Sequence, residues 1–386
     1  MILSYLCKRL RRHISEAFLS LLIVAVVVVL LLGLSHYHGT QQAKLDAAYE
    51  DFVIRCTVTN VSGARTTDLN IREGYIRLLE KGGKLSSYAK DVFLLRALED
   101  ATLRKEAYIP LEAAENVSFY MTNDPASAAY LAGTKIQYQE GYGNESFCGE
   151  EPICILNDKL SSRISERGTV CLSTPWGEME TRVVGTFPGE DATVFVAWQP
   201  WDRQLTAAGQ ARAASSMAFT LADNHLLGEA KEVFRDFFVP ASRTNKMSNM
   251  HGLIIDDSLF VDTVVVLERS LALMRVLQAM VYVLSVGISF LVAYLGIRSR
   301  RLELAVMRSL GAKSLAIYAE VLCEHILFFL VGTAGAYLVS TLWGIPAKMG
   351  DISTVGAFMV CYLLGVALAV AQATSGQIMQ TLKGKE

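Results

Sequence analysis

The sequence predicts an α-helical membrane protein with four transmembrane helices plus an α+β extracytoplasmic domain inserted between helices 1 and 2. Three observations predict this fold class: the composition, four long apolar runs, and mixed strand and helix patterns between the first two runs. Of the 386 residues, 52% are hydrophobic without counting glycine and 19% are charged, whereas an ordinary soluble domain has about 45–50% apolar residues with glycine included and roughly 25% charged. This excess excludes intrinsic disorder, a fibrous repeat and a wholly soluble enzyme.

Each apolar run is long enough to cross a bilayer as a helix, which requires about 20 apolar residues. A helix also satisfies its own backbone hydrogen bonds in lipid. The predicted transmembrane helices cover residues 17–37, 271–297, 317–345 and 352–374. The first run could instead be a signal peptide, because a basic segment precedes it. Its end, from Gly33 to His38, lacks an A-x-A-like cleavage site, so the sequence favours an uncleaved anchor and leaves occasional cleavage open.

Basic residues gather on one side of the predicted helices. The N-terminal segment 1–16, the loop 298–316 and the tail 375–386 carry an excess of lysine and arginine, whereas the short loop after the third run is near neutral. Cytoplasmic loops carry such an excess, so we expect both termini in the cytoplasm and residues 38–270 outside. The basic, amphipathic segment 1–16 could lie along the membrane surface or could serve only as a topology signal.

The segment 38–270 alternates between strand and helix patterns and is long enough for one sizeable core or two small ones. Stretches rich in β-branched and aromatic residues predict strands over residues 52–59, 152–156, 181–187, 193–198, 217–221 and 253–255. Capping residues and apolar periodicity predict helices over residues 72–80, 158–163 and 226–239.

The residues before the second apolar run predict a helical stalk. Its apolar residues are spaced by 4, 3, 4 and 3 positions: Phe260, Val264, Leu267, Leu271 and Met274. This spacing is close to the 3.5-residue repeat of a packed helix seam, so the second transmembrane helix would continue out of the membrane. An ordinary amphipathic core helix explains the same spacing, and both interpretations stay open.

Four of the seven cysteines lie in the segment 38–270: Cys56, Cys148, Cys154 and Cys171. Outside the cytoplasm disulfides can persist, and Cys148 and Cys154 are close enough in the sequence to form a local bridge. Four cysteines allow three complete pairings, and spacing alone does not choose between them. Because no C-x-x-C pair and no nearby histidine pair is present, we expect no metal site.

The motifs of common catalytic sites are missing from the sequence. Gly82-Gly83-Lys84 is followed by Leu85 and not by the Ser or Thr of a phosphate-binding loop. No G-x-S-x-G elbow and no H-E-x-x-H helix is present, and the net charge of −2 lacks the basic excess of a nucleic-acid-binding domain. We therefore expect a non-catalytic membrane subunit with no cofactor and no nucleic-acid partner.

Two carboxylates stand out at the start of the third run. Glu320 and Glu324 lie one helical turn apart, and His325 follows Glu324. Ionisable residues inside a transmembrane helix are costly and often functional. Glu320 fits an interfacial depth close to the basic loop, whereas Glu324 is a candidate functional residue within the membrane.

The loop between the second and third runs carries the most specific motif, Arg301-Leu-Glu303-Leu-Ala-Val-Met307-Arg308-Ser-Leu-Gly311-Ala312. It resembles the R-x-E-[IL]-[AG]-[IV]-[LM]-R-[AS]-[IL]-G-A stretch of FtsX/MacB-like ABC-transporter permeases. Glu324 stands where that family usually has a glutamate, and Gly332 and Gly335 match its glycine-rich continuation. Residues 154–198 resemble the MacB-type extracytoplasmic core domain, and the order of one span, a large external domain and three spans is also that of the family.

The resemblance implies a permease subunit that transmits the ATP-driven movement of a separate cytoplasmic ABC ATPase to the external domain, for export or extraction of a substrate. In this interpretation the loop is the coupling helix, and the contacts with the ATPase come from Arg301, Glu303, Met307, Arg308, Gly311 and Ala312. Gly332, Gly335 and Ala336 would allow close helix packing.

The resemblance also implies a multi-pass protein of the bacterial plasma (inner) membrane that contacts lipid and forms a permease homodimer or heterodimer. The chain departs from larger relatives in having a single four-span unit and no fused ATPase. The alternative is a division-type protein, or a sensor or scaffold, whose external domain regulates a cell-wall enzyme or binds a ligand. The sequence does not identify the substrate.

Overall fold

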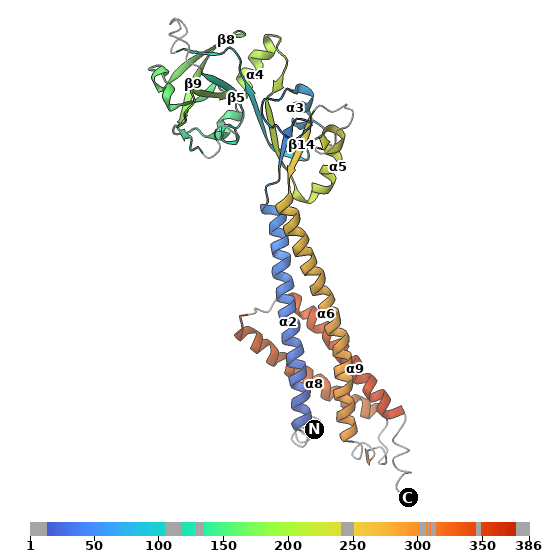
Figure 1. Ribbon diagram of the computed structural model, residues 1–386. Coiled ribbons are helices and arrows are strands. Elements are labelled where there is room, and N and C mark those ends of the chain that lie inside the picture. The colour runs from blue at the N-terminus through green and yellow to red at the C-terminus, as the bar shows by residue number, and fades with distance from the viewer. Residues whose placement is uncertain are drawn as a thin grey trace. The chain divides into compact units, whose positions relative to one another are not determined.

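The computed structural model describes residues 14–104, 117–128, 131, 134–240, 251–300, 306–307, 309, 314–344 and 349–375 (Figure 1). The chain divides into two compact units. The helical unit comprises Met1–Ala48 and Asp262–Glu386, and the α/β unit comprises Tyr49–Val261.

Four long helices account for the apolar runs: α2 (Ile14–Asp51), α6 (Ser258–Ser299), α8 (Ser314–Leu342) and α9 (Met349–Ser375). All four are long and apolar enough to cross a membrane, which confirms the prediction of four such helices. Helix α6 is a single helix of 42 residues that contains both the predicted stalk and the second apolar run. Helix α2 has 38 residues and extends beyond the first run. Neither contains a proline, which would interrupt the backbone hydrogen bonds.

The helical unit has a core of apolar side chains from all four helices. Its largest members are Leu31, Leu32, Phe329, Phe358 and Tyr362. Aromatic rings join α8 to α9, since the Phe329 and Phe358 ring centroids lie 5.5 Å apart. Packing of this kind, with small residues where backbones approach, stabilises helix bundles in lipid, where the hydrophobic effect gives no net attraction between helices.

Two glycines mark the closest helix approaches described. A Cβ at Gly365 of α9 would lie 2.0 Å from Ser289 Oγ and 2.4 Å from the Val286 carbonyl oxygen of α6. A Cβ at Gly332 of α8 would lie 2.9 Å from Val24 Cγ1 of α2. At both positions the neighbouring helix occupies the space that a side chain would need.

The three predicted packing residues therefore differ in their surroundings. Gly332 lies against α2, and Ala336 is fully buried. Gly335 has no atom within 4 Å of the position where its Cβ would be. Gly365, which makes the tighter contact, was not among the predicted residues, because a lone glycine in an apolar run does not reveal which helix it faces.

The α/β unit contains fourteen described strands: β1 (Arg55–Thr59), β2 (Ile71–Arg72), β3 (Ala89–Ala97), β4 (Thr102–Arg104), β5 (Ser118–Thr122), β6 (Gln137–Tyr138), β7 (Ile153–Asn157), β8 (Thr169–Thr174), β9 (Gly177–Phe187), β10 (Thr193–Ala197), β11 (Ala213–Ala214), β12 (Ser216–Leu221), β13 (Val239–Pro240) and β14 (Gly252–Asp256). The α-helices are α3 (Glu73–Leu79), α4 (Trp198–Ala207) and α5 (Leu227–Phe237). The 3₁₀ helices are η1 (Pro125–Ser127), η3 (Asn144–Cys148), η4 (Asp158–Arg163) and η5 (Asn224–Leu226).

Twelve of these strands form one mixed sheet in the order β13-β14-β1-β12-β3-β5-β10-β7-β9-β8-β4, with β6 paired to β9. Strands β8 and β9 lie toward one end of the sheet and β14 toward the other (Figure 1). Strand β1 follows α2 and pairs with β14, which precedes α6, with Arg55 opposite Asp256. The exit of α2 and the start of α6 therefore meet at neighbouring strands.

All six strands predicted from the sequence are present, as β1, β7, β9, β10, β12 and β14. The predicted helices correspond to α3, α5 and the 3₁₀ helix η4, whose Asn157 side chain accepts a hydrogen bond from the Lys159 amide as expected of a cap. In α5 the predicted apolar face is buried, and the Phe234 and Phe219 ring centroids lie 5.5 Å apart.

Strand β3 was missed for a physical reason. Its apolar alternation is interrupted at Asp91, which has a φ of 48°, and the pairing with β12 shifts register between Ala218 and Thr220. Such a bulge places two residues opposite one and breaks the period of two on which strand prediction depends.

The local bridge considered between Cys148 and Cys154 is not formed in this structure, where both are free thiols. Cys154 is fully buried within β7. Cys148 is exposed at the end of η3, and its Sγ donates to the carbonyl oxygen of Asn123 at 3.4 Å.

Candidate functional site

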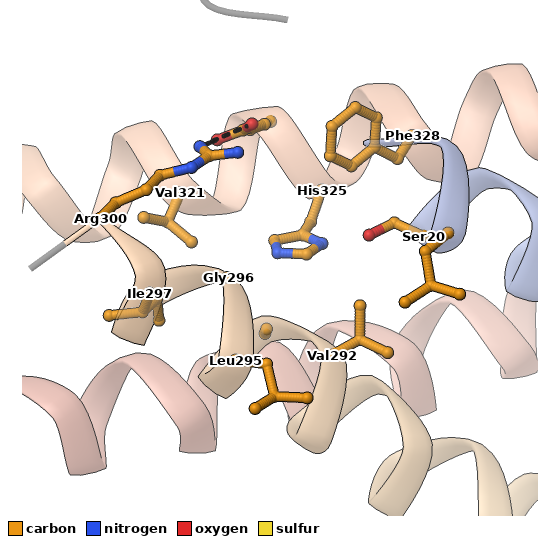
Figure 2. A pocket seen from close by; sticks show the side chains of 12 residues that line it. Ser20, Val292, Leu295, Gly296, Ile297, Arg300, Val321, His325 and Phe328 are labelled. Atoms are coloured by element: carbon orange, nitrogen blue, oxygen red, sulfur yellow. Dashed lines mark hydrogen bonds and ion pairs between the residues drawn. The ribbon is translucent and has the colours of Figure 1, made fainter. Parts of the chain in front are cut away.

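The central feature of the helical unit is a buried ion pair between α6 and α8. Arg300, the first residue after α6, donates from Nη1 to both carboxylate oxygens of Glu324 at 2.9 Å (Figure 2). The two side chains are only 10% and 6% exposed. A buried carboxylate is tolerated when an opposite charge hydrogen-bonds to it, so this contact explains how the Glu324 carboxylate can be buried within a largely apolar helix.

His325 links α8 to the other neighbouring helix. Its Nδ1 lies 2.9 Å from the Tyr362 hydroxyl of α9, and its ring meets the Phe328 ring edge-on, with centroids 5.8 Å apart. Successive residues of a helix point about 100° apart. Glu324 and His325 therefore contact different helices, α6 and α9, from adjacent positions of α8.

A cavity of about 110 Å³ lies beside these polar side chains. Helices α2, α6 and α8 line it with Leu19, Ser20, Val292, Ala293, Leu295, Gly296, Ile297, Arg300, Val321, Glu324, His325 and Phe328. In Figure 2 the His325 ring projects between Ser20 and the α6 residues. The cavity thus has apolar walls and one polar side.

A second buried carboxylate lies in the first turn of α9. Asp351 is 4% exposed and accepts a 2.7 Å hydrogen bond from the Ser35 hydroxyl of α2. An acidic residue in the first turn also interacts favourably with the helix dipole. In the sequence, Asp351 is only one charge of a near-neutral short loop, because its partner Ser35 lies 316 positions earlier in the chain.

Within the α/β unit, one side chain holds the end of α2. The Asn224 amide of η5 donates to the carbonyl oxygens of Tyr49 at 2.9 Å and Phe52 at 2.7 Å. The neighbouring His225 ring stacks on the Tyr49 ring, with centroids 4.0 Å apart. Phe260, in the first turn of α6, packs edge-on against Tyr49. We refer to these residues, Tyr49, Phe52, Asn224, His225 and Phe260, as the helix junction.

The predicted coupling residues fall mostly outside the described part of the chain. This applies to Arg301, Glu303, Arg308, Gly311 and Ala312. Met307 is described and is helical and half-buried. The structure therefore describes Arg300, the residue before the motif, but does not test the roles expected of the motif residues.

The described residues contain no group of three or more His, Cys, Asp or Glu side chains placed to hold a metal ion. The strongest signal that the sequence contained for the site was Glu324 itself. Its partner, Arg300, was seen only as one of several basic residues of the loop, because charge counting does not distinguish an arginine that points back into the bundle.

Comparison with known proteins finds no sequence match and only distant similarity to solved structures. No protein-family profile and no curated protein sequence matches this chain. Among solved structures, the periplasmic region of MacB from Actinobacillus actinomycetemcomitans is similar with 10% identity and a TM-score of 0.34, over 54% of this chain and 91% of that region. The extracellular domain of the noncanonic ABC-type transporter YknZ from Gram-positive bacteria is similar with 13% identity and a TM-score of 0.30, over 52% of this chain and 99% of that domain.

Similarity at these scores does not establish a common fold. The features of this chain that bear on its function are therefore the loop motif, the four apolar helices and the contacts of Arg300.

Proposed function

We propose that this chain is the permease subunit of an FtsX/MacB-like ABC transporter, which passes the movement of a separate ATPase to an extracytoplasmic domain for export or extraction of a substrate. The observation that carries the proposal is the motif at residues 301–312. It lies between α6 and α8, two helices long and apolar enough to cross a membrane.

The ion pair supports a mechanical role for this loop. Arg300 immediately precedes the motif and is bound to Glu324, so a displacement of the loop would act on α6 and α8 together. His325 would extend the displacement to α9 through Tyr362. A loop joined to the helices only through its backbone would transmit less of this displacement, because α6 and α8 could then move independently.

The continuous helices α6 and α2 would carry a movement of the loop toward the α/β unit. Helix α6 begins at Ser258 and is unbroken to Ser299, and its first turn packs in the helix junction through Phe260. Helix α2 ends in the same junction, held by Asn224. A shift of either helix would therefore reach the paired strands β1 and β14, and the α/β unit would change shape with it.

In this proposal both termini and the loop lie in the cytoplasm, and the α/β unit lies outside the bacterial plasma membrane. The ATPase is a separate cytoplasmic protein, and two permease subunits assemble with it as a homodimer or heterodimer. The chain itself performs no catalysis. Substrate is handled by the external unit, because the four long helices are predominantly apolar.

Co-purification tests the proposal. The tagged full-length chain is isolated from its native membrane, and the accompanying proteins are identified by mass spectrometry. We expect a P-loop ATPase to co-purify, and we expect Arg308→Ala and Gly311→Leu to reduce the ATPase recovered several-fold.

The matched control is Arg235→Ala, which removes an exposed arginine of α5 that pairs with neighbouring Glu232. Recovery of the ATPase should be unchanged in this variant. The proposal is wrong if no ATPase accompanies the wild-type chain, or if the loop variants retain it as fully as the control.

A further inference from the structure

The first turn of α9 contacts both of the longest helices, at the end of the helical unit away from Arg300. Its Asp351 carboxylate accepts a 2.7 Å hydrogen bond from the Ser35 hydroxyl of α2. One turn later, the Thr354 carbonyl oxygen accepts a 3.4 Å hydrogen bond from the Tyr282 hydroxyl of α6. Asp351 and Thr354 are only 4% and 9% exposed. Residues three positions apart lie on the same helix face, so one buried face of α9 meets both α2 and α6.

Beyond this turn α2 and α6 continue past the ends of α8 and α9 (Figure 1). At about 1.5 Å per residue, α2 extends about 24 Å past Ser35, and α6 begins about 36 Å before Tyr282. Few side chains are buried in the parts of these extensions that belong to the helical unit, residues 36–48 and 262–278. They are Gln41, Leu45, Ala48, Val264 and Leu271. Packing supplies most of the stability of helices in proteins, so this small set fixes the separation of the two helices only weakly.

The other half of α9 is joined to the neighbourhood of the ion pair. The Tyr362 hydroxyl lies 2.9 Å from His325 Nδ1 of α8, and Tyr362 is about 17 Å along the helix from Asp351 at 1.5 Å per residue. Between α9 and α6 the approach is close at Gly365, where a Cβ would lie 2.4 Å from the Val286 carbonyl oxygen. Helix α9 is unbroken over this length. A displacement of His325 would therefore reach the first turn of α9.

We propose that the first turn of α9 fixes the separation of α2 and α6 where they leave the four-helix bundle, with Asp351 and Ser35 as the positioning residues. A displacement that enters at the ion pair then passes to α2 as well as to α6. A carboxylate suits this role, because hydrogen bonds to charged groups are roughly twice as strong as those between neutral groups. The helix dipole also stabilises a carboxylate in the first turn. This inference rests on the mechanical role in the proposed function and not on the identity of the substrate.

The distance between α2 and α6 in the full-length chain tests the inference. Spin labels are attached to p-acetylphenylalanine introduced at the exposed positions of Lys44 and Arg269, which leaves the native cysteines unlabelled. The chain is placed in lipid nanodiscs, and double electron–electron resonance measures the distribution of the distance between the labels. We expect a narrow distribution without further change. In Ser35→Ala the distribution should be about twice as broad, because the hydrogen bond to the carboxylate is lost.

The matched control is Ser285→Ala on α6. It removes a buried serine hydroxyl that donates to the Tyr282 carbonyl oxygen of its own helix at 2.6 Å, and the distribution should stay narrow. Ser35→Thr retains the hydroxyl and should also stay narrow. Asp351→Ala should broaden the distribution as Ser35→Ala does. The combined variant should broaden it no further than either single variant, because both remove the same contact.

Two outcomes overturn the inference: a narrow distribution in folded Ser35→Ala, or equal broadening in Ser285→Ala. Circular dichroism and gel filtration establish that each variant folds. If Asp351→Ala does not fold, Ser35→Ala still decides, since it removes a single hydroxyl. Recovery of the ATPase with the wild-type chain is measured separately. Absence of an ATPase would contradict the proposed function, whereas normal recovery with an unchanged distribution in Ser35→Ala would contradict only the role of the α9 turn.

Discussion

Arg300 and Glu324 form a buried ion pair in which the guanidinium Nη1 lies 2.9 Å from both carboxylate oxygens. The two residues are 24 positions apart, and the motif proposed to contact an ATPase lies between them. The pair therefore closes the loop at its base and joins the end of α6 to α8.

Removing both partners of this pair should destabilise the helical unit by less than the sum of the two single removals. Glu324→Ala or Arg300→Ala removes one charge and leaves the other buried without its ion-pair partner, which typically costs about 3–5 kcal/mol. The double variant Arg300→Ala/Glu324→Ala removes both charges and should cost less than the sum of the two single alanine variants. Thermal unfolding of the solubilised full-length chain measures this, with exposed Arg298→Ala as the control. Additive losses would contradict a direct pair.

Substitution by alanine should lower the stability of the helical unit at Gly365 but not at Gly335. Gly365→Ala places a Cβ 2.0 Å from Ser289 Oγ, so α9 must move away from α6 and the unfolding temperature should fall. Gly335→Ala meets no atom within 4 Å and should be neutral, or stabilising by up to about 1 kcal/mol, through its higher helix propensity. Equal responses in thermal unfolding would show that the α6–α9 contact does not form as described.

Asn224→Ala should loosen the helix junction without unfolding the α/β unit. The side chain is 7% exposed and donates to the carbonyl oxygens of Tyr49 and Phe52. Leaving these part-buried carbonyl oxygens without that donor costs about 1–3 kcal/mol, so amide hydrogen exchange at residues 52–56 should accelerate about tenfold. Asn70→Ala, which truncates an exposed asparagine, is the control. Unchanged hydrogen exchange in Asn224→Ala would show that the helix junction does not take part in the proposed transmission of movement.

The α/β unit should lose stability as the pH falls below neutrality because of His251. This side chain is buried beside Tyr75, with ring centroids 5.0 Å apart. Burial lowers the pKa of His251, and the charge of Arg72 lowers it further. The unfolded chain, whose histidines have a pKa of about 6.5, then binds more protons than the folded chain as the pH falls through that value, so stability decreases.

The measurement for His251 compares thermal unfolding of the wild-type chain and of His251→Gln at neutral pH and at mildly acidic pH. The variant should lose less stability on acidification, because it cannot take up the proton. A pH dependence that is identical in the two chains would assign the effect to other groups.

Among the four cysteines of the α/β unit, Cys148 should react first with maleimide. It is exposed, whereas Cys56, Cys154 and Cys171 are buried. Burial raises the pKa of Cys56 to about 12 and raises that of Cys154 and of Cys148 as well, so the exposure of Cys148, and not a more acidic thiol, makes it the first to react. Peptide mass mapping after brief labelling identifies the site, and Cys148→Ser should abolish the early adduct. A protected Cys148 linked to another cysteine would contradict the free thiols of this structure.

The sequence by itself was sufficient to locate the four apolar helices and six strands of the α/β unit. These features depend on local properties: hydrophobic length for a membrane helix, and β-branched content or helical periodicity for the other elements. It also marked Glu324, because a carboxylate inside an apolar run is unusual whatever surrounds it. The coupling residues of the loop remain sequence predictions, with Met307 alone among the described residues.

The tertiary structure decided which residues meet. Arg300 turned back to Glu324, Gly365 fitted against Ser289, and Asn224 bound the end of α2, although no local pattern distinguished these residues from similar neighbours. Pairing between distant segments depends on how whole helices and strands pack, and one buried charge or one missing Cβ then determines how closely they approach. For this reason the sequence predicted the elements, whereas the ion pair, the cavity and the helix junction emerged only from their arrangement in space.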